Sequence, residues 1–134
     1  MEVKIDTPLL DSLTAQAKCS PRLRMNYDLR DSEQDSSQRM LNAIEPGSAV
    51  PIHRHMDTSE TVVCLRGHLK WIFHNPDSSV AEIIELKAGG SIAVLNVPAG
   101  QWHSVESIES GSVILEMKDG AYKPLDNSDI LWVE

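Results

Sequence analysis

The sequence predicts an all-β protein, a sandwich or closed barrel, with one short helix near its N-terminus. Six short runs rich in Val, Ile and Leu follow one another at spacings of about ten residues, as in sandwiches and barrels. Segments containing Gly, Pro, Asn and Asp separate them and predict turns. Because no segment with helical periodicity lies between the runs, a parallel α/β sheet is disfavoured. The runs are residues 39–45, 60–67, 69–75, 80–86, 91–97 and 112–118.

The helix is predicted from residues 7–21, TPLLDSLTAQAKCSP. Thr7 is the expected N-terminal cap, Pro8 fits the first helical position, and Pro21 marks the end. Four apolar residues at helical spacing form one face of this helix. They are Leu9, Leu10, Leu13 and Ala17.

Length and charge limit the class of protein. The 134 residues fit one domain, and within it we expect a helix with an arginine-rich arm over residues 1–30 and a barrel over residues 31–134. A net charge of -8 disfavours nucleic acid and anionic membranes as partners, although a small anionic ligand can still bind a locally basic pocket.

No apolar run is long enough to span a membrane, and the N-terminal residues lack the basic, then apolar, then small-residue order of a secretion signal. We therefore expect a cytoplasmic protein.

The two cysteines, Cys19 and Cys64, are predicted to be reduced thiols. They lie far apart in the sequence and belong to no CxxC pair. Cys64 falls within an apolar run, where a small buried thiol fits well.

A cluster of metal-ligand residue types stands out in residues 51–67, PIHRHMDTSETVVCLRG. His53 and His55 are two residues apart, so on a strand their side chains project from one face. Glu60 follows across a short bend and can return to the same pocket, and the turn at residues 98–100 can aim His103 inward from another strand. Imidazole and carboxylate are common ligands of transition metals, so this pattern predicts a metal site. His68 and His74 adjoin turns, and we expect structural roles for them.

The same residues resemble the two cupin motifs. Gly47, five residues, His53-x-His55, four residues, Glu60, six residues and Gly67 match the first motif in full. The second motif is partial, because Pro98-x-Gly100, two residues and His103 match it, but Ser107 replaces the usual Asn and Gly90 lies two residues too early. The resemblance implies a jelly-roll β-barrel in which a metal ion is bound by His53, His55, Glu60 and His103.

Four further segments resemble the WbuC-type cupins: SPRLRMNYDLR at 20–30, QRMLNAIEPGS at 38–48, WHS at 102–104 and VILEMKDGAY at 113–122. This resemblance covers the chain from about residue 20 onward. It departs from the family at Ala121, where a proline is usual. Genes for O-antigen and other surface polysaccharides often accompany members of this family, but no established reaction comes with it.

The segment before the barrel carries the candidate substrate-binding residues Arg22, Arg24, Asn26 and Arg30. Arginine suits bidentate recognition of carboxylate or phosphate, and Arg22 and Arg24 alternate, so on an extended segment they face one way. The alternative is that these arginines pair with the acidic residues of the surface at positions 28–35. Trp102 either lines the pocket or packs on the opposite face from its strand neighbour His103. Tyr122 is a candidate catalytic acid or base.

Three functions remain open at this point. The first is a metal-dependent isomerase or epimerase that acts on a carbohydrate or nucleotide-sugar intermediate, with the metal as Lewis acid. The second is an Fe(II)-dependent oxygenase acting on a small organic acid, and the third is a non-catalytic ligand-binding or regulatory cupin. Nitrogen and oxygen ligands without a thiolate suit Zn²⁺ or Fe²⁺, and also Mn²⁺ or Ni²⁺. We expect a homodimer, with the Trp71 and Phe73 strand and the helix as interface candidates, unless Trp71 belongs to the core.

Overall fold

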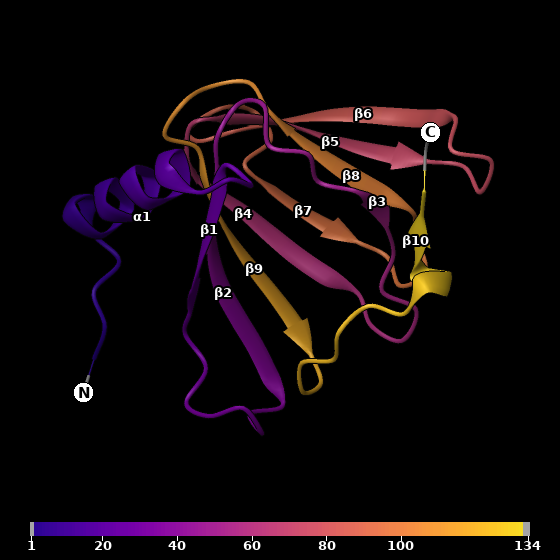
Figure 1. The fold of residues 1–134 in the computed structure, drawn as a ribbon, viewed down its shortest axis with the longest axis horizontal. Coiled ribbons are helices and arrows are strands. Elements are labelled where there is room, and N and C mark those ends of the chain that lie inside the picture. Colours follow the sequence, from indigo (N-terminus) through magenta and orange to yellow (C-terminus); the bar gives the residue numbers. More distant parts are fainter. Residues whose placement is uncertain (1, 133–134) are drawn as a thin grey trace.

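A computed structural model describes residues 2–132 and confirms the predicted all-β class. Within this range the chain forms one α-helix, ten strands and a short 3-10 helix (Figure 1). The elements are α1 (Thr7–Cys19), β1 (Arg24–Asp28), β2 (Ser37–Ile44), β3 (Ile52–His53), β4 (Glu60–Arg66), β5 (His68–His74), β6 (Val80–Lys87), β7 (Val94–Val97), β8 (His103–Ser107), β9 (Val113–Asp119), η1 (Asn127–Asp129) and β10 (Ile130–Leu131).

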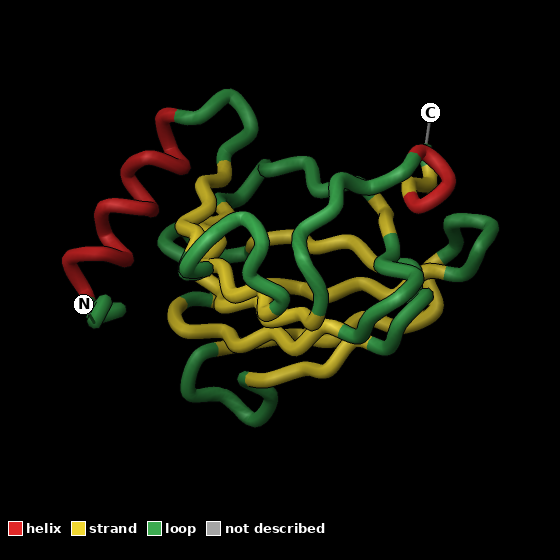
Figure 2. Tube along the Cα trace, turned by 90° about the horizontal axis from the view of Figure 1, so that it is seen from below, coloured by secondary structure: helices red, strands yellow, loops and turns green. Residues whose placement is uncertain are grey.

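The strands form two antiparallel five-stranded sheets that face each other as a jelly-roll barrel (Figures 1 and 2). One sheet has the order β1-β2-β9-β4-β7, and the other has the order β10-β3-β8-β5-β6. Side chains alternate between the two faces of each strand. Inward-facing positions of both sheets therefore share one interior, and this alternation decides which polar residues point into the barrel.

The barrel interior is apolar over most of its length. Its buried core includes Val62, Leu69, Trp71 and Ile114. A second cluster lies on the outer side of the first sheet, where Leu13 and Ala17 of α1 pack against Leu41, Ala43 and Val113. Both faces of β2 and β9 are thus covered, by the helix on one side and by the barrel interior on the other.

The N-cap of helix α1 lies one residue before the predicted position. Asp6, not Thr7, is the N-cap, because its side chain accepts a hydrogen bond of 3.1 Å from the backbone N–H of Leu9. The Asp6 carboxylate is also the better cap at the positive end of the helix dipole. The helix ends at Cys19, two residues before Pro21. No helix within residues 2–132 is long and apolar enough to cross a membrane.

The two thiols differ in exposure, and we expect this to set their reactivity. Both cysteines are free; Cys19 is exposed at the end of α1, and Cys64 is buried in the core. Burial raises the pKa of the Cys64 thiol, so its thiolate is scarce at neutral pH and becomes more abundant only as pH rises. Native protein should react rapidly with one equivalent of a thiol reagent such as Ellman's reagent at pH 8, and with a second only after unfolding. Rapid reaction of both thiols in the native protein would contradict this assignment.

Candidate metal centre

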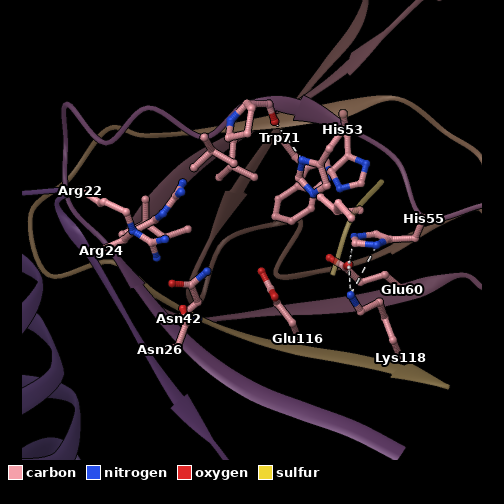
Figure 3. Close-up of a pocket in the computed structure, with 16 residues that line it drawn as sticks. Arg22, Arg24, Asn26, Asn42, His53, His55, Glu60, Trp71, Glu116 and Lys118 are labelled. Carbon is pink, nitrogen blue, oxygen red and sulfur yellow. Dashed lines mark hydrogen bonds and ion pairs between the residues drawn. The ribbon is translucent and has the colours of Figure 1, made fainter. Parts of the chain in front are cut away.

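Three histidines meet inside the barrel, and Figure 3 labels two of them, His53 and His55. His53 lies on β3, His55 follows in the loop before β4, and His103 begins β8 directly opposite His53 in the strand register. One ring nitrogen from each of the three lies within 4.8 Å of the other two. The ring centroids of His53 and His103 are 4.3 Å apart, and those of His53 and His55 are 5.1 Å apart. The structure thus brings together residues that are 50 positions apart in the sequence.

Backbone carbonyls fix the tautomers of two rings. Nδ1 of His53 lies 2.8 Å from the Pro51 carbonyl, and Nδ1 of His103 lies 2.9 Å from the Gln101 carbonyl. A carbonyl can only accept, so each Nδ1 carries the proton and each Nε2 presents a lone pair. In metal sites, a hydrogen bond at the second ring nitrogen typically orients the imidazole in this way. Both rings therefore present Nε2 as the donor atom for an ion.

The Nε2 atom of His103 is the strongest indication that the cluster fits a metal. His103 is 1% exposed, and its Nε2 has no hydrogen-bond partner among residues 2–132. The Trp71 ring is stacked on this imidazole, with ring centroids 5.5 Å apart. A buried polar atom without a partner is costly, and a bound cation would satisfy it. Three converging imidazole nitrogens are the donor set that divalent transition metals prefer.

Burial also keeps the three rings neutral at neutral pH. It lowers the pKa of His53 and of His55 to about 4 and that of His103 to about 3. Neighbouring positive charge at Lys118 acts in the same direction on all three rings. Imidazole must be unprotonated to bind an ion, so these rings are already in the metal-binding form at neutral pH.

Glu60 opens β4 and is 3% exposed at the wall of the same cavity. Its Oε2 lies 3.2 Å from His55 Nε2 and 3.9 Å from Lys118 Nζ. Two donors at neighbouring positions on one octahedral ion lie about 3 Å apart when each bond is about 2.1 Å. The spacing of Glu60 and His55 is therefore compatible with both atoms binding the same ion.

A cavity of about 220 Å³ extends from the histidines towards β1. Figure 3 shows Arg22, Arg24 and Asn26 at the side away from the imidazoles, with Asn42 and Glu116 between the two groups. The apolar part of the cavity wall is formed by Ile44, Val50, Pro51, Trp71, Val105 and Leu125.

Glu116 and Lys118 also line this cavity, and our sequence interpretation did not assign them a role. Both lie on β9, on the same face as the core residue Ile114, so strand alternation points them inward. Lys118 Nζ lies 3.5 Å from His55 Nδ1. Burial raises the pKa of Glu116, and the negative charge of Glu60 adds to this effect. The only sequence signal was a pair of charged residues with a period of two in an otherwise apolar run.

The candidate substrate-binding arginines separate into two groups. Arg22 and Arg24 line the cavity with Asn26, and neither forms an ion pair with an acidic residue of the described chain. Arg24 Nη1 donates to the Ala49 carbonyl at 3.3 Å, and burial together with Arg22 lowers its pKa. Arg30 instead lies outside the cavity lining, in a 2.7 Å ion pair with Asp28.

Trp102 and Tyr122 do not line the cavity. Trp102 directly precedes β8 and is buried, and the guanidinium of Arg54 lies 4.3 Å from its ring centroid. Tyr122 is 54% exposed, and its ring lies under Arg30. Trp102 thus contacts Arg54, and Tyr122 lies at the surface beside Arg30; both residues are outside the cavity lining.

The other two histidines lie outside the cluster. His74 is buried and bridges the Ser78 carbonyl and the Ser104 hydroxyl, at 3.0 and 2.7 Å. His68 lies on β5, with Nε2 3.2 Å from Glu85 at the surface. The ring nitrogens of both residues contact other side chains or the backbone and do not converge with the three histidines of the cluster.

Several solved structures have a similar fold, and one of them is named a cupin domain. The chain matches an oxalate oxidase in complex with the substrate analogue glycolate, with a TM-score of 0.62, 14% identity and coverage of 77% of this chain and 54% of that chain. It matches KdgF from Halomonas sp. with a TM-score of 0.60, 12% identity and coverage of 75% and 82%. It also matches the Schizosaccharomyces pombe Cnp3 cupin domain, with a TM-score of 0.57, 17% identity and coverage of 74% and 65%. The chain spans about half the length of the oxalate oxidase, and identities this low establish the fold alone.

Sequence comparison gives a family for most of the chain. No curated protein matches it significantly. Residues 5–86, which include α1, the arginines of the cavity, His53, His55 and Glu60, match the family described as a domain of unknown function, DUF6016. Because this match covers more than half of the sequence, the chain belongs to the DUF6016 family.

Proposed function

We propose that this cupin is a metal-dependent enzyme whose ion is held by His53, His55, His103 and Glu60. The observation that carries the proposal is the buried, unpartnered Nε2 of His103 beside two further imidazoles. Four protein ligands leave one or two positions open on an octahedral ion, depending on whether Glu60 binds through two oxygens or one, and open positions are typical of catalytic rather than structural sites. A bound ion would supply Lewis-acid chemistry, polarising a carbonyl or hydroxyl oxygen of the substrate. Zn²⁺ and Fe²⁺ are our first candidates, followed by Mn²⁺ and Ni²⁺.

The proposed substrate is a small anionic molecule, bound by Arg22, Arg24 and Asn26. The support is the placement of two arginines, free of acidic partners in the described chain, at one side of the cavity in a protein of net charge -8. Arginines of this kind bind carboxylate or phosphate strongly. The cavity of about 220 Å³ is smaller than a typical site for a drug-sized ligand, so a nucleotide sugar would have to extend out of it.

The biological setting we propose is surface polysaccharide biosynthesis, with an isomerase or epimerase reaction on an acidic sugar intermediate. The support is the resemblance of residues from about 20 onward to the WbuC-type cupins. Glu116 and Lys118 line the same cavity as the imidazoles, where a carboxyl and an ammonium group can hold or move a proton of the substrate.

A second candidate, an Fe²⁺-dependent oxygenase, is favoured by the size of the cavity. Structures with a similar fold include proteins named oxalate oxidase and oxalate decarboxylase, and oxalate is a small organic acid. If the protein carries iron and consumes oxygen with such an acid, this candidate replaces the isomerase. Ligand binding without any turnover would favour the third possibility, a regulatory cupin.

Metal content tests the proposal directly. Protein purified without a histidine tag or added metal should contain about one equivalent of a single transition metal per chain by elemental mass spectrometry. Absence of metal even after reloading would refute the proposed site. Iron rather than zinc would favour the oxygenase.

Replacing Arg24 with alanine should leave metal content unchanged and weaken anion binding. Arg24 lies across the cavity from the imidazoles, so its loss removes a charge-assisted hydrogen-bond donor without touching a ligand. We expect affinity for inorganic phosphate, measured by titration calorimetry on the metal-loaded protein, to fall about tenfold or more. Arg30→Ala is the matched control, because Arg30 lies outside the cavity lining. Equal losses in both variants would indicate a general charge effect.

We also propose a cytoplasmic homodimer built on the free sheet edges. The Trp71 side chain is 1% exposed and belongs to the barrel core, so it cannot contribute to an interface. In contrast, β6 and β7 are the outer strands of their sheets, and Val80, Ile83 and Val94 are more than half exposed on them. Light scattering on the purified protein should give about twice the chain mass of 14.9 kDa, and a monomer would refute this proposal.

A further inference from the structure

Three buried polar atoms without a protein partner belong to residues that line the candidate cavity. In the described part of the chain, four buried side-chain polar atoms lack a hydrogen-bond partner. Three of them belong to residues that line this cavity: Asn42 Oδ1, Trp71 Nε1 and His103 Nε2. The fourth belongs to Arg30, which lies elsewhere. Such atoms are rare in native proteins, so three around one cavity indicate groups that a bound molecule satisfies.

Each of these atoms requires a different kind of partner from the ligand. The indole N–H of Trp71 can only donate, so it requires an acceptor oxygen. The Oδ1 atom of Asn42 can only accept, so it requires a donor such as a hydroxyl. His103 Nε2 is accounted for by the proposed metal. The donor and the acceptor that remain specify a ligand with at least one hydroxyl group.

The charges of the lining specify an anion. Two glutamates and three basic residues point into the cavity, so the protein alone contributes an excess of one positive charge if both carboxyls are ionised. A divalent ion would add two more. The positive charge is not evenly distributed, because Arg22 and Arg24 lie at the side away from the imidazoles (Figure 3). An acid group of the ligand is therefore expected at that side.

We infer that the cavity selects a small hydroxy acid, and that Trp71 and Asn42 are its specificity-determining residues. The acid group lies against Arg22 and Arg24, a hydroxyl of the ligand donates to Asn42 Oδ1, and a ligand oxygen accepts from Trp71 Nε1. This inference rests on the proposed function, because it describes the substrate of the same site. It adds two residues to which the sequence gave no role in ligand binding, and a requirement for hydroxyl groups that the arginines alone do not impose.

Three acids with the same three-carbon skeleton test the inference: glycerate with two hydroxyls, lactate with one and propionate with none. Titration calorimetry on the metal-loaded protein should give glycerate at least about tenfold tighter binding than propionate, because propionate leaves a buried donor and acceptor unpaired. Since a hydroxy acid can also chelate a metal through its hydroxyl, the series is repeated on metal-free protein. The preference for glycerate should persist there.

Two variants assign that preference to the named side chains. Trp71→Phe removes the indole N–H, and Asn42→Leu removes the amide oxygen with little change of volume. Each should reduce the ratio of glycerate to propionate affinity to less than about threefold, mainly by weakening glycerate. Trp102→Phe is the matched control, since this indole lies outside the cavity, and it should keep the ratio of the unmodified protein. Metal affinity measured on each variant confirms that the site is still assembled.

The outcomes separate this inference from the proposal on which it rests. Failure to bind metal would refute the proposed enzyme. With metal bound, equal affinity for the three acids, no glycerate binding up to roughly 10 mM, or a preference that survives in both variants would overturn the inference alone. A preference that disappears in Trp71→Phe and Asn42→Leu but not in Trp102→Phe would establish it.

Discussion

Replacing His55 with alanine should reduce metal affinity by more than about 100-fold, because even the loss of a residue that only supports a ligand costs about 10–100-fold. His55 provides one of the three converging nitrogen donors, and no other imidazole of the described residues can take its place. It is also the best of the three for this test. His103 is almost fully buried against Trp71, so its removal would leave a hole in the core, whereas the His55 side chain is 17% exposed at the cavity wall.

The variant should still fold, since Glu60 keeps Lys118 as a nearby cation, 3.9 Å away. Metal content and affinity would be measured by elemental mass spectrometry and competition with a chelator, with circular dichroism as a check on the fold. His68→Ala is the matched control, because His68 is a surface histidine whose only ionic partner in the described chain is the exposed Glu85. Full metal content in the His55 variant would mean that the ligand set is wrong.

The sequence predicted the parts of the site that are local in the chain. His53 and His55 lie two residues apart, and their convergence needs only a short extended segment. Glu116 and Lys118 were missed because their place depends on the pairing of β9 with β2 and β4, which sets Glu60 opposite Lys118. Register between distant strands is not encoded in any one segment. The same reasoning applies to Asn42, which looks like an ordinary strand residue, and to Trp71, for which the sequence suggested only an interface or a core position.

The fold was predictable wherever strands are long and apolar. The six runs of Val, Ile and Leu correspond to β2, β4, β5, β6, β7 and β9. None of the six runs contains β1, β3, β8 or β10, although the pattern of metal-ligand residues placed His53 and His103 on strands. β3 and β10 have two residues each, and β8 reads HSVES, with one strongly apolar residue. These strands are held in place by their neighbours, since His53 pairs with both His103 and Ile130. Short strands of this kind follow from tertiary contacts, which a pattern of side chains along one segment does not contain.

Replacing Gly67 with alanine should destabilise the barrel by about 2–4 kcal/mol, from overpacking together with an unfavourable backbone conformation. Gly67 joins β4 to β5 with a φ of +89°. A Cβ atom there would lie 2.6 Å from the backbone Cα of Ser112 and would overlap its side chain. Ser112 is fully buried, and its hydroxyl accepts from the His68 N–H and donates to the Glu109 carbonyl. It therefore cannot move aside without breaking these bonds.

Gly89→Ala separates the two causes of this loss. Gly89 also has a positive φ, +72°, but nothing lies within 4 Å of the position that a Cβ would take. Its replacement should cost only the backbone strain, about 1 kcal/mol. Urea unfolding of both variants gives the comparison, and equal free energies of unfolding would show that Ser112 does not restrict residue 67. Gly67 follows the last residue of β4, whereas Glu60 is its first residue. A large loss of stability in Gly67→Ala would therefore also mean that this glycine of the motif serves the packing of the barrel, while the histidines of the motif serve the metal.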